Sequence, residues 1–246
     1  MFLDGSGAAI GGGVHGVDHA SSVLTGLHSG VTMKSIAAIL VAGALLMSRA
    51  NAQDVRFSFG PQAGIAISAF EDAWKDFYGM GYGGGVHADA DIARFFSARL
   101  NVEYYSFASD KDKLKPLVAS GFGLTASDIA SLSGGNIGAF IVEMEAIGKI
   151  PTKSSVTPYA LFGVGIHSLS LSDLSGSDKS GRSATLTADD VKFDGGTKFG
   201  LDFGIGCEIN LNHSVALTVE ARYVLVFTAN NNNAAMPITV GANFHL

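Results

Sequence analysis

The chain has 246 residues, of which 47% are hydrophobic, only 15% are charged and 32 are glycine. An ordinary soluble domain has about 25% charged residues and about 7% glycine. A mean hydropathy of +0.30 argues against a disordered chain. One cysteine excludes an intramolecular disulfide framework, and a net charge of −6 gives no support to nucleic-acid binding. The composition is that of a membrane protein, although only one short stretch resembles a membrane helix.

That stretch lies within residues 33–52, which are typical of a cleaved signal peptide. Lys34 precedes the uncharged run Ile36–Leu46, which is too short to cross a bilayer because a spanning helix needs about 20 apolar residues. An Ala-Asn-Ala triplet follows and predicts cleavage before Gln53. Residues 1–32 precede this start, and we expect them to be a non-native or disordered extension. The remaining residues, 53–246, are predicted to form one domain.

Apolar and polar side chains alternate along that domain with a period of two, which is typical of β-strands with two different faces. In residues 198–209, for example, Phe199 and Phe203 fall on one face, whereas Lys198 and Asp202 fall on the other. The same pattern recurs in eight segments: 55–68, 80–91, 97–107, 137–147, 158–170, 197–209, 214–227 and 237–246. Their lengths fit a strand that crosses a bilayer at a tilt, which needs about 9–11 residues.

The predicted connections alternate between long and short. The long ones are 69–79, 108–136, 171–196 and 228–236. Outer-membrane barrels have short periplasmic turns, long extracellular loops and an even number of strands. We therefore predict an all-β fold, an eight-stranded antiparallel up-and-down transmembrane barrel with both ends of the domain on the periplasmic side. We also expect a short helix in 125–132 and a mobile loop at 171–196.

In a membrane barrel the apolar face points to lipid and the polar face points inward. Interior side chains fill a barrel of eight strands, and an unpaired buried charge costs several kcal/mol. The polar faces therefore predict a filled lumen with an ion-pair network rather than an open pore. Tyr104, Tyr105 and Tyr223 are interpreted as membrane-girdle residues. The predicted network residues are Arg56, His87, Asp89, Asp91, Arg99, Glu103, Glu143, Glu145, Lys198, Asp202, Glu208, Glu220 and Arg222.

The last residues carry a pattern of polar, glycine and hydrophobic positions: Thr239, Gly241, Phe244 and Leu246. This pattern resembles the C-terminal assembly signal of bacterial outer-membrane proteins, although the final residue there is usually aromatic. With the eight strands, it makes residues 53–246 similar to the small OmpA/OmpX-like barrel family. The resemblance implies insertion by periplasmic chaperones and the barrel-assembly machinery, a location in the outer membrane, and a surface role carried by the loops.

Two groups of residues could suggest chemistry. His167 and Ser168 resemble the residue types of lipid A deacylases, but neighbouring residues of a strand face opposite ways, and a nucleophile and its base must reach hydrogen-bond distance. His87, Asp89 and Asp91 share one strand face and could bind a metal. Same-face residues about 7 Å apart cannot all reach one ion without neighbouring strands, so pairing with arginines is the favoured interpretation. We expect no enzyme activity, cofactor or metal.

The leading functional hypothesis is a structural or adhesin-like barrel that acts through its extracellular loops. The alternatives are a small passive channel and, less favoured, a lipid A-modifying enzyme. The expected partners are outer-membrane lipids, lipopolysaccharide, the assembly machinery with its chaperones, and a host or surface ligand. Nucleic acid is not expected.

Overall fold

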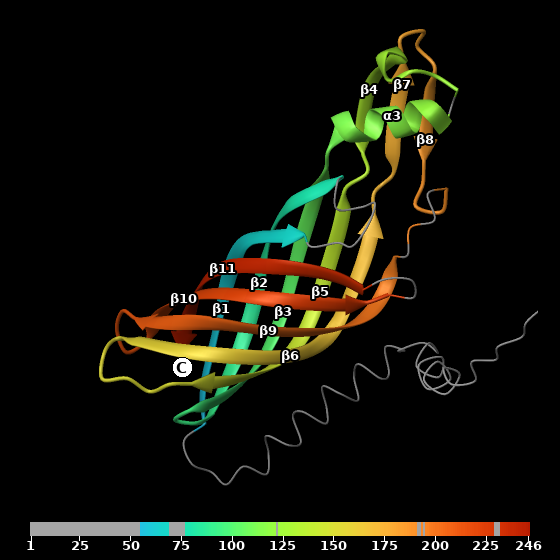
Figure 1. The fold of residues 1–246 in the computed structure, drawn as a ribbon. Coiled ribbons are helices and arrows are strands. Elements are labelled where there is room, and N and C mark those ends of the chain that lie inside the picture. The colour runs from blue at the N-terminus through green and yellow to red at the C-terminus, as the bar shows by residue number, and fades with distance from the viewer. Residues whose placement is uncertain (1–54, 69–76, 122, 191–192, 194, 229–231) are drawn as a thin grey trace, which may run out of the picture. The chain divides into compact units, whose positions relative to one another are not determined.

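The computed structural model describes residues 55–68, 77–121, 123–190, 193, 195–228 and 232–246, so the predicted extension and signal peptide lie outside the described residues. Eight antiparallel strands close into a barrel in the order β1-β11-β10-β9-β6-β5-β3-β2 (Figure 1), which confirms the predicted fold class. None of the helices in the described residues is long and apolar enough to cross a membrane. The barrel strands are β1 (Arg56–Ser68), β2 (Tyr78–Ala93), β3 (Phe96–Ser109), β5 (Ile137–Lys149), β6 (Val156–Leu171), β9 (Gly196–Asn210), β10 (Val215–Phe227) and β11 (Asn232–His245).

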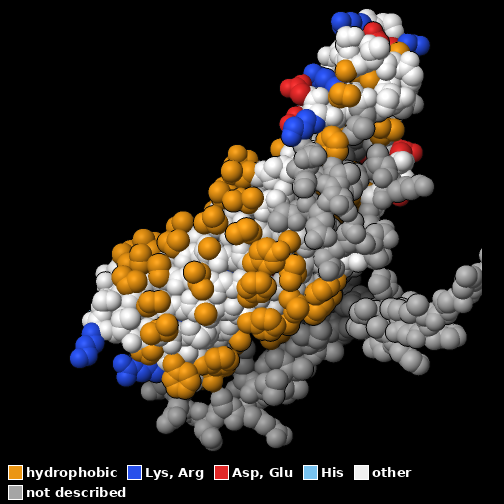
Figure 2. Space-filling view, viewed as in Figure 1, with side chains coloured by type: hydrophobic (Ala, Val, Ile, Leu, Met, Phe, Trp, Pro, Cys, Tyr) orange, Lys and Arg blue, Asp and Glu red, His pale blue; other side chains and the backbone are white. Residues whose placement is uncertain are grey.

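The two faces of each strand differ in exposure as the alternation predicts. On β9, Phe203 and Ile205 are 49% and 69% exposed on the outside, whereas Asp202 is fully buried in the lumen. Hydrophobic side chains cover the visible barrel wall, and the coloured charges lie at its ends (Figure 2). The outer surface of the barrel is therefore apolar, and the polar side chains of the strands point inward.

The connections 108–136 and 171–196 contain regular secondary structure in their described parts, whereas the sequence predicted long loops there and one short helix. The mobility of 171–196 stays a prediction. The two connections contain helix α3 (Lys111–Gly121), the 3-10 turn η3 (Ala126–Asp128), and the strands β4 (Ile129–Gly134), β7 (Leu174–Asp178) and β8 (Ser183–Leu186). These elements are called the cap below. The three strands form a separate sheet in the order β4-β7-β8. The short helix expected in 125–132 is only the 3-10 turn, and β4 follows it directly.

The cap sheet continues the β5–β6 hairpin. Gly134 on β4 pairs with Leu174 on β7, and Ile137 on β5 pairs with Leu171 on β6, so both ladders share one register. The ladder is interrupted at Gly135 and Asn136. The φ angles of 80° at Gly134 and 67° at Gly135 favour glycine. On the cap side of this break, the alternation is too short and too serine-rich to reveal β4, β7 and β8 from the sequence.

A small apolar core holds the cap together. Leu114 and Val118 of α3 pack with Leu174 of β7, and Phe77 contacts both this cluster and the apolar cluster at the adjoining end of the lumen. The Tyr78 hydroxyl donates a hydrogen bond of 2.8 Å to the carbonyl of Gly135. These contacts join the cap to the barrel end that carries the long connections, called the loop end below; the opposite end is called the turn end.

Candidate functional site

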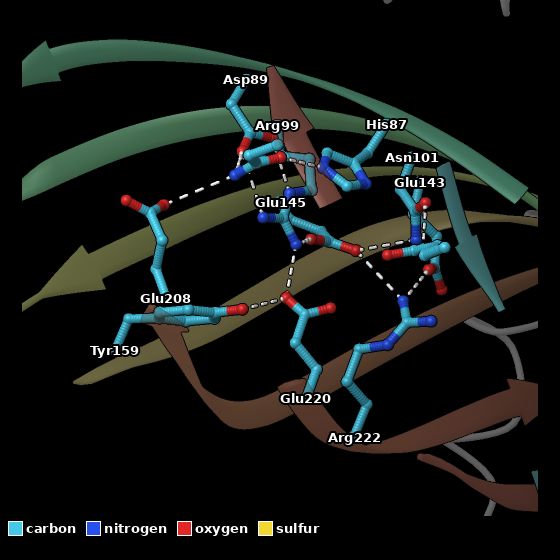
Figure 3. Close-up of polar contacts among 12 residues, drawn as sticks. His87, Asp89, Arg99, Asn101, Glu143, Glu145, Tyr159, Glu208, Glu220 and Arg222 are labelled. Carbon is cyan, nitrogen blue, oxygen red and sulfur yellow. Dashed lines mark hydrogen bonds and ion pairs between the residues drawn. The ribbon is translucent and has the colours of Figure 1, made fainter. Parts of the chain in front are cut away.

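The most distinctive feature of the barrel is a connected set of buried polar side chains in its lumen (Figure 3). Arg222 on β10 is fully buried, and its Nη1 lies 3.2 Å from Glu143 Oε2 and 3.1 Å from Glu145 Oε1. Its Nη2 pairs with Glu103 on β3. One guanidinium therefore joins three carboxylates that come from two other strands, which is the planar, multi-donor geometry that arginine supplies.

A second arginine occupies the next level toward the turn end. Arg99 on β3 donates from Nε to Asp89 Oδ1 at 2.6 Å, and from Nη2 to Asp89 Oδ2 at 3.1 Å. Its Nη1 also pairs with Glu220 on β10, which accepts a further bond of 2.7 Å from the hydroxyl of Tyr159. Arg99 therefore links β3 with β2 and with β10 through charge-assisted hydrogen bonds.

Lys149 organises the turn end of the lumen. Its Nζ lies 2.8 Å from Asp91 Oδ1 and 3.6 Å from Glu208 Oε2. Asn243 on β11 donates to Asp89 at 3.3 Å and to Glu208 at 3.4 Å, and its amide oxygen is bonded to the ring of His87. The final strand is thereby tied into the same network.

Neutral side chains complete the connections. Gln62 on β1 donates to Asn101 at 2.9 Å and to Glu103 at 2.7 Å, and Asn101 donates to Glu145 at 3.1 Å. Tyr105 donates to Glu103 at 3.1 Å. With Asp202 on β9, whose Oδ2 lies 4.0 Å from Arg222 Nη1, polar contacts reach every strand of the barrel.

Most of the predicted network residues face the lumen, but two of them, Arg56 and Lys198, lie at its margin. Arg56 is exposed at the start of β1, and within the described residues no ion pair joins it to the lumen. Lys198 is half-buried on β9, opposite His167 on β6. The interpretation of Tyr105 as a girdle residue was wrong, because its side chain is 1% exposed in the lumen. The other predicted residues are buried or half-buried and face inward: His87, Asp89, Asp91, Arg99, Glu103, Glu143, Glu145, Asp202, Glu208, Glu220 and Arg222.

Sequence reasoning missed several members of the network. Lys149 lies two residues beyond the predicted strand 137–147, and β5 extends to include it. Tyr159 was not distinguished from an outward aromatic residue. The signal that could have found Tyr159 is a glycine across the ladder: Gly206 is its partner on β9, and a Cβ there would lie 2.5 Å from Tyr159 Cζ. Gly83 has the same relation to Tyr105, whose ring a Cβ at position 83 would overlap. Glycine at these positions makes room for inward rings.

The loop end of the lumen is apolar instead of charged. Tyr105, Phe107, Ile141 and Val226 belong to a buried cluster there. A cavity of about 40 Å³ remains among these side chains, and it is lined almost entirely by apolar groups. The lumen therefore has two layers, an apolar one beside the cap and a polar one toward the turn end.

In each of the two groups considered for chemistry, the fold keeps the member side chains from meeting at one point. His167 is 1% exposed in the lumen, whereas Ser168 points to the outside of β6. His87, Asp89 and Asp91 engage Asn243, Arg99 and Lys149 respectively. Each member of the second group therefore has its own partner and does not converge with the others on one point.

Asp178 fixes the turn between β7 and β8 in the cap. Its carboxylate accepts hydrogen bonds from the Ser180 hydroxyl at 2.7 Å, from the Arg182 amide at 2.9 Å and from Arg182 Nε at 2.8 Å. These bonds, the Ser180 hydroxyl first, lower the pKa of Asp178 to about 2. The cause is that donors stabilise the carboxylate more than its protonated form.

We expect the order of this turn to depend on the Asp178 charge. Because the pKa of Asp178 is lower in the folded turn than in the unfolded chain, its carboxylate stabilises the turn fully at pH values above about 3.9, the unfolded pKa. This stabilisation is lost as the pH falls through about 2. In Asp178→Asn, the amides of Ser180 and Arg182 should exchange with solvent faster at neutral pH than in the unmodified protein. Hydrogen exchange followed by mass spectrometry measures this. Unchanged exchange would contradict the assignment, and Asp189→Asn serves as an exposed control.

The closed barrel, its apolar outer wall and its polar lumen define a β-barrel protein that spans a membrane. The family model described as "Outer membrane protein beta-barrel domain" matches residues 36–245. The chain belongs to this family, and the protein is located in the outer membrane. In such barrels the short turns face the periplasm and the long connections face outward. Because the barrel lies in the outer membrane, the molecules around its wall are outer-membrane lipids and lipopolysaccharide.

Several solved structures of outer-membrane barrels are distantly similar. Neisserial surface protein A is 14% identical, covers 76% of this chain and 96% of its own, and has a TM-score of 0.47. Ail of Yersinia pestis, the attachment invasion locus protein, is 11% identical over 78% of this chain and 97% of its own, with a TM-score of 0.38. OprG of Pseudomonas aeruginosa is 10% identical over 78% and 94%, with a TM-score of 0.39. No curated protein matches the chain. These values carry no inference about role.

Proposed function

We propose that the protein is a non-enzymatic surface-interaction barrel that presents the cap outside the cell while its lumen stays closed. The observation that carries this proposal is the combination of a lumen filled at two levels with a cap that has its own sheet and apolar core. A filled lumen serves stability rather than transport, and a cap with its own core offers a defined surface.

The filled lumen argues against the alternative of a small passive channel. Arg222 and Arg99 cross the lumen to carboxylates on other strands, and the apolar cluster around Phe107 lies between this network and the cap. The cavity of about 40 Å³ in that cluster is lined almost entirely by apolar groups, so it offers little to a passing ion.

We expect the protein to show no stable open steps in a planar lipid bilayer at neutral pH. Phe107→Gly removes a large ring from the apolar layer. Conductance should stay at the baseline in this variant, because the ion-paired layer toward the turn end remains. Stable open steps from the unmodified protein would contradict a closed lumen and favour the channel. A porin of known conductance in the same bilayer is the positive control.

The cap supports a surface role because it has a sheet and an apolar core of its own. A cavity of about 280 Å³ lies on it, and its lining includes Val118, Ile129, Leu174 and Leu186 with Arg182 near its polar edge. An apolar hollow with a few polar groups is the usual form of a binding site. This supports recognition of a host or surface ligand by the cap.

Two variants of one strand test the role of the cap. Leu174→Asp puts a charge into the cap core, whereas Ser175→Asp puts the same charge on its exposed side. We expect only Leu174→Asp to abolish binding of bacteria to cultured host cells and extracellular matrix. Both variants should keep the faster gel migration of the unboiled, folded barrel. Equal binding by both variants and the unmodified protein would contradict a role for the cap.

The non-enzymatic part of the proposal is supported by the opposite directions of His167 and Ser168. Overexpression should leave the mass spectrum of lipid A unchanged, and a mass shift would favour the enzyme alternative.

We also propose that insertion depends on the barrel-assembly machinery and periplasmic chaperones. At the end of the chain, the pattern residues Thr239 and Gly241 are buried, whereas Phe244 and Leu246 are exposed. An exposed hydrophobic end on the strand that closes the barrel supports its role as an assembly signal. Phe244→Ser should reduce the amount of folded protein in isolated outer membranes.

A further inference from the structure

The lumen contains more acids than bases. Eight carboxylates take part in the network or lie within it, and even if all three inward histidines carry a charge, only seven cations face them. The carboxylates are Asp89, Asp91, Glu103, Glu143, Glu145, Asp202, Glu208 and Glu220, and the cations are Arg99, Lys149, Arg222, Lys198, His87, His167 and His245. Buried negative charge without a counter-charge is costly.

The excess of negative charge is concentrated at three residues on β5 and β9, the two strands that flank β6. Glu143 and Glu145 on β5 and Asp202 on β9 each offer one oxygen, and these oxygens lie within 4.8 Å of one another. Their side chains are 1%, 0% and 0% exposed, respectively. Arg222 contacts one oxygen of each glutamate, but its distance of 4.0 Å from Asp202 is too long for a hydrogen bond.

Several atoms of this cluster have no hydrogen-bond partner among the described residues. They include both carboxylate oxygens of Asp202, Glu143 Oε1 and Glu145 Oε2. The last of these lies 3.6 Å from Arg99 Nη1, again beyond hydrogen-bond distance. Buried carboxylate oxygens are almost always satisfied by a donor or a cation. The cluster therefore has capacity for a ligand that the two arginines do not provide.

A buried histidine adds a second kind of donor beside the cluster. His167 is 1% exposed, its Nε2 lies 3.3 Å from Glu143 Oε1, and this nitrogen forms no hydrogen bond with the described residues. Two glycines make room for these groups. A Cβ at Gly200 would overlap the His167 ring, and one at Gly163 would overlap the Asp202 carboxylate.

We propose that Glu143, Glu145 and Asp202, with His167 beside them, bind one divalent metal cation in the barrel lumen. Carboxylate oxygens are preferred by hard cations such as Ca²⁺, Mg²⁺ and Mn²⁺, whereas imidazole suits transition metals. The mixed set of donors therefore favours Mn²⁺ among these three. The cation offsets the local excess of negative charge. The site does not depend on the proposed role of the cap.

Binding of Mn²⁺ to the full refolded protein tests this site. After treatment with a chelator, we expect the unmodified protein to bind about one Mn²⁺, seen as loss of the free-ion signal in electron paramagnetic resonance. Asp202→Asn should weaken this binding at least tenfold. Glu208→Gln, which removes a buried carboxylate paired with Lys149 outside the cluster, should bind Mn²⁺ as the unmodified protein does.

Heat unfolding separates metal binding from a purely structural role of Asp202. Without metal, Asp202→Asn should unfold at a higher temperature than the unmodified protein, because it removes an uncompensated buried charge. Added Mn²⁺ should raise the midpoint of the unmodified protein, because a ligand of the folded state stabilises it, but not that of the variant. If Asp202→Asn does not fold, His167→Gln takes its place in the measurement of the shift that Mn²⁺ causes in the midpoint. Absence of Mn²⁺ binding, or equal binding by the cluster variants, would overturn the proposal.

Discussion

Replacing Arg222 with methionine is expected to lower the free energy of unfolding by about 3–5 kcal/mol, the usual cost of removing one partner from a buried ion pair. Methionine keeps much of the volume of arginine but none of its charge. Glu103, Glu143 and Glu145 would lose their shared cation while staying buried. Urea titration of the refolded barrel in detergent micelles, followed by far-ultraviolet circular dichroism, measures the loss.

Arg182→Met is the matched control for this variant. The Arg182 side chain is 77% exposed in the cap, so solvent reaches the cationic partner of its ion pair with Asp178. Exposed pairs contribute about 0–1 kcal/mol. If Arg222→Met were no more destabilising than this control, the lumen network would not contribute to stability as its geometry indicates.

The second large effect concerns the lipid face. Phe203→Arg is expected to destabilise the barrel by about 2–4 kcal/mol, the cost of an arginine near the bilayer midplane of a barrel. Phe203 lies near the middle of β9, is 49% exposed and packs beside Tyr223 at a ring distance of 5.3 Å. Unfolding by urea from lipid vesicles measures this cost.

Leu211→Arg provides the comparison near the membrane surface. Leu211 lies in the turn between β9 and β10 and is 57% exposed. The same change there should cost only about 0–1 kcal/mol. Equal effects at the two positions would contradict the assignment of Phe203 to the lipid-facing wall.

The barrel was predictable from sequence because its two faces differ in chemistry at every second residue. Phe203 and Asp202 are neighbours in the chain, and their opposite polarity alone assigns one to lipid and the other to the lumen. The same rule assigns Arg222 and Glu220 to the interior of β10. Alternation of this kind needs no knowledge of which strands pair.

The contacts within the lumen were less predictable. Which carboxylate meets Arg222 depends on the register of several strands around a closed barrel, and no local pattern encodes that register. Tyr105 was assigned to the wrong side because tyrosine suits both an interface and a lumen that glycines make wide enough. The cap was missed because its strands are short and rich in serine and glycine.

The shared register of the cap sheet and the β5–β6 hairpin has a mechanical consequence. A partner that pulls on the cap loads the backbones of β4 and β7, and each of these continues along the chain into a strand of the barrel wall. Both strands are pulled in the same direction, so the force neither slides them past one another nor peels them apart. Tension applied to the cap is thereby passed to covalent bonds and to the whole barrel wall.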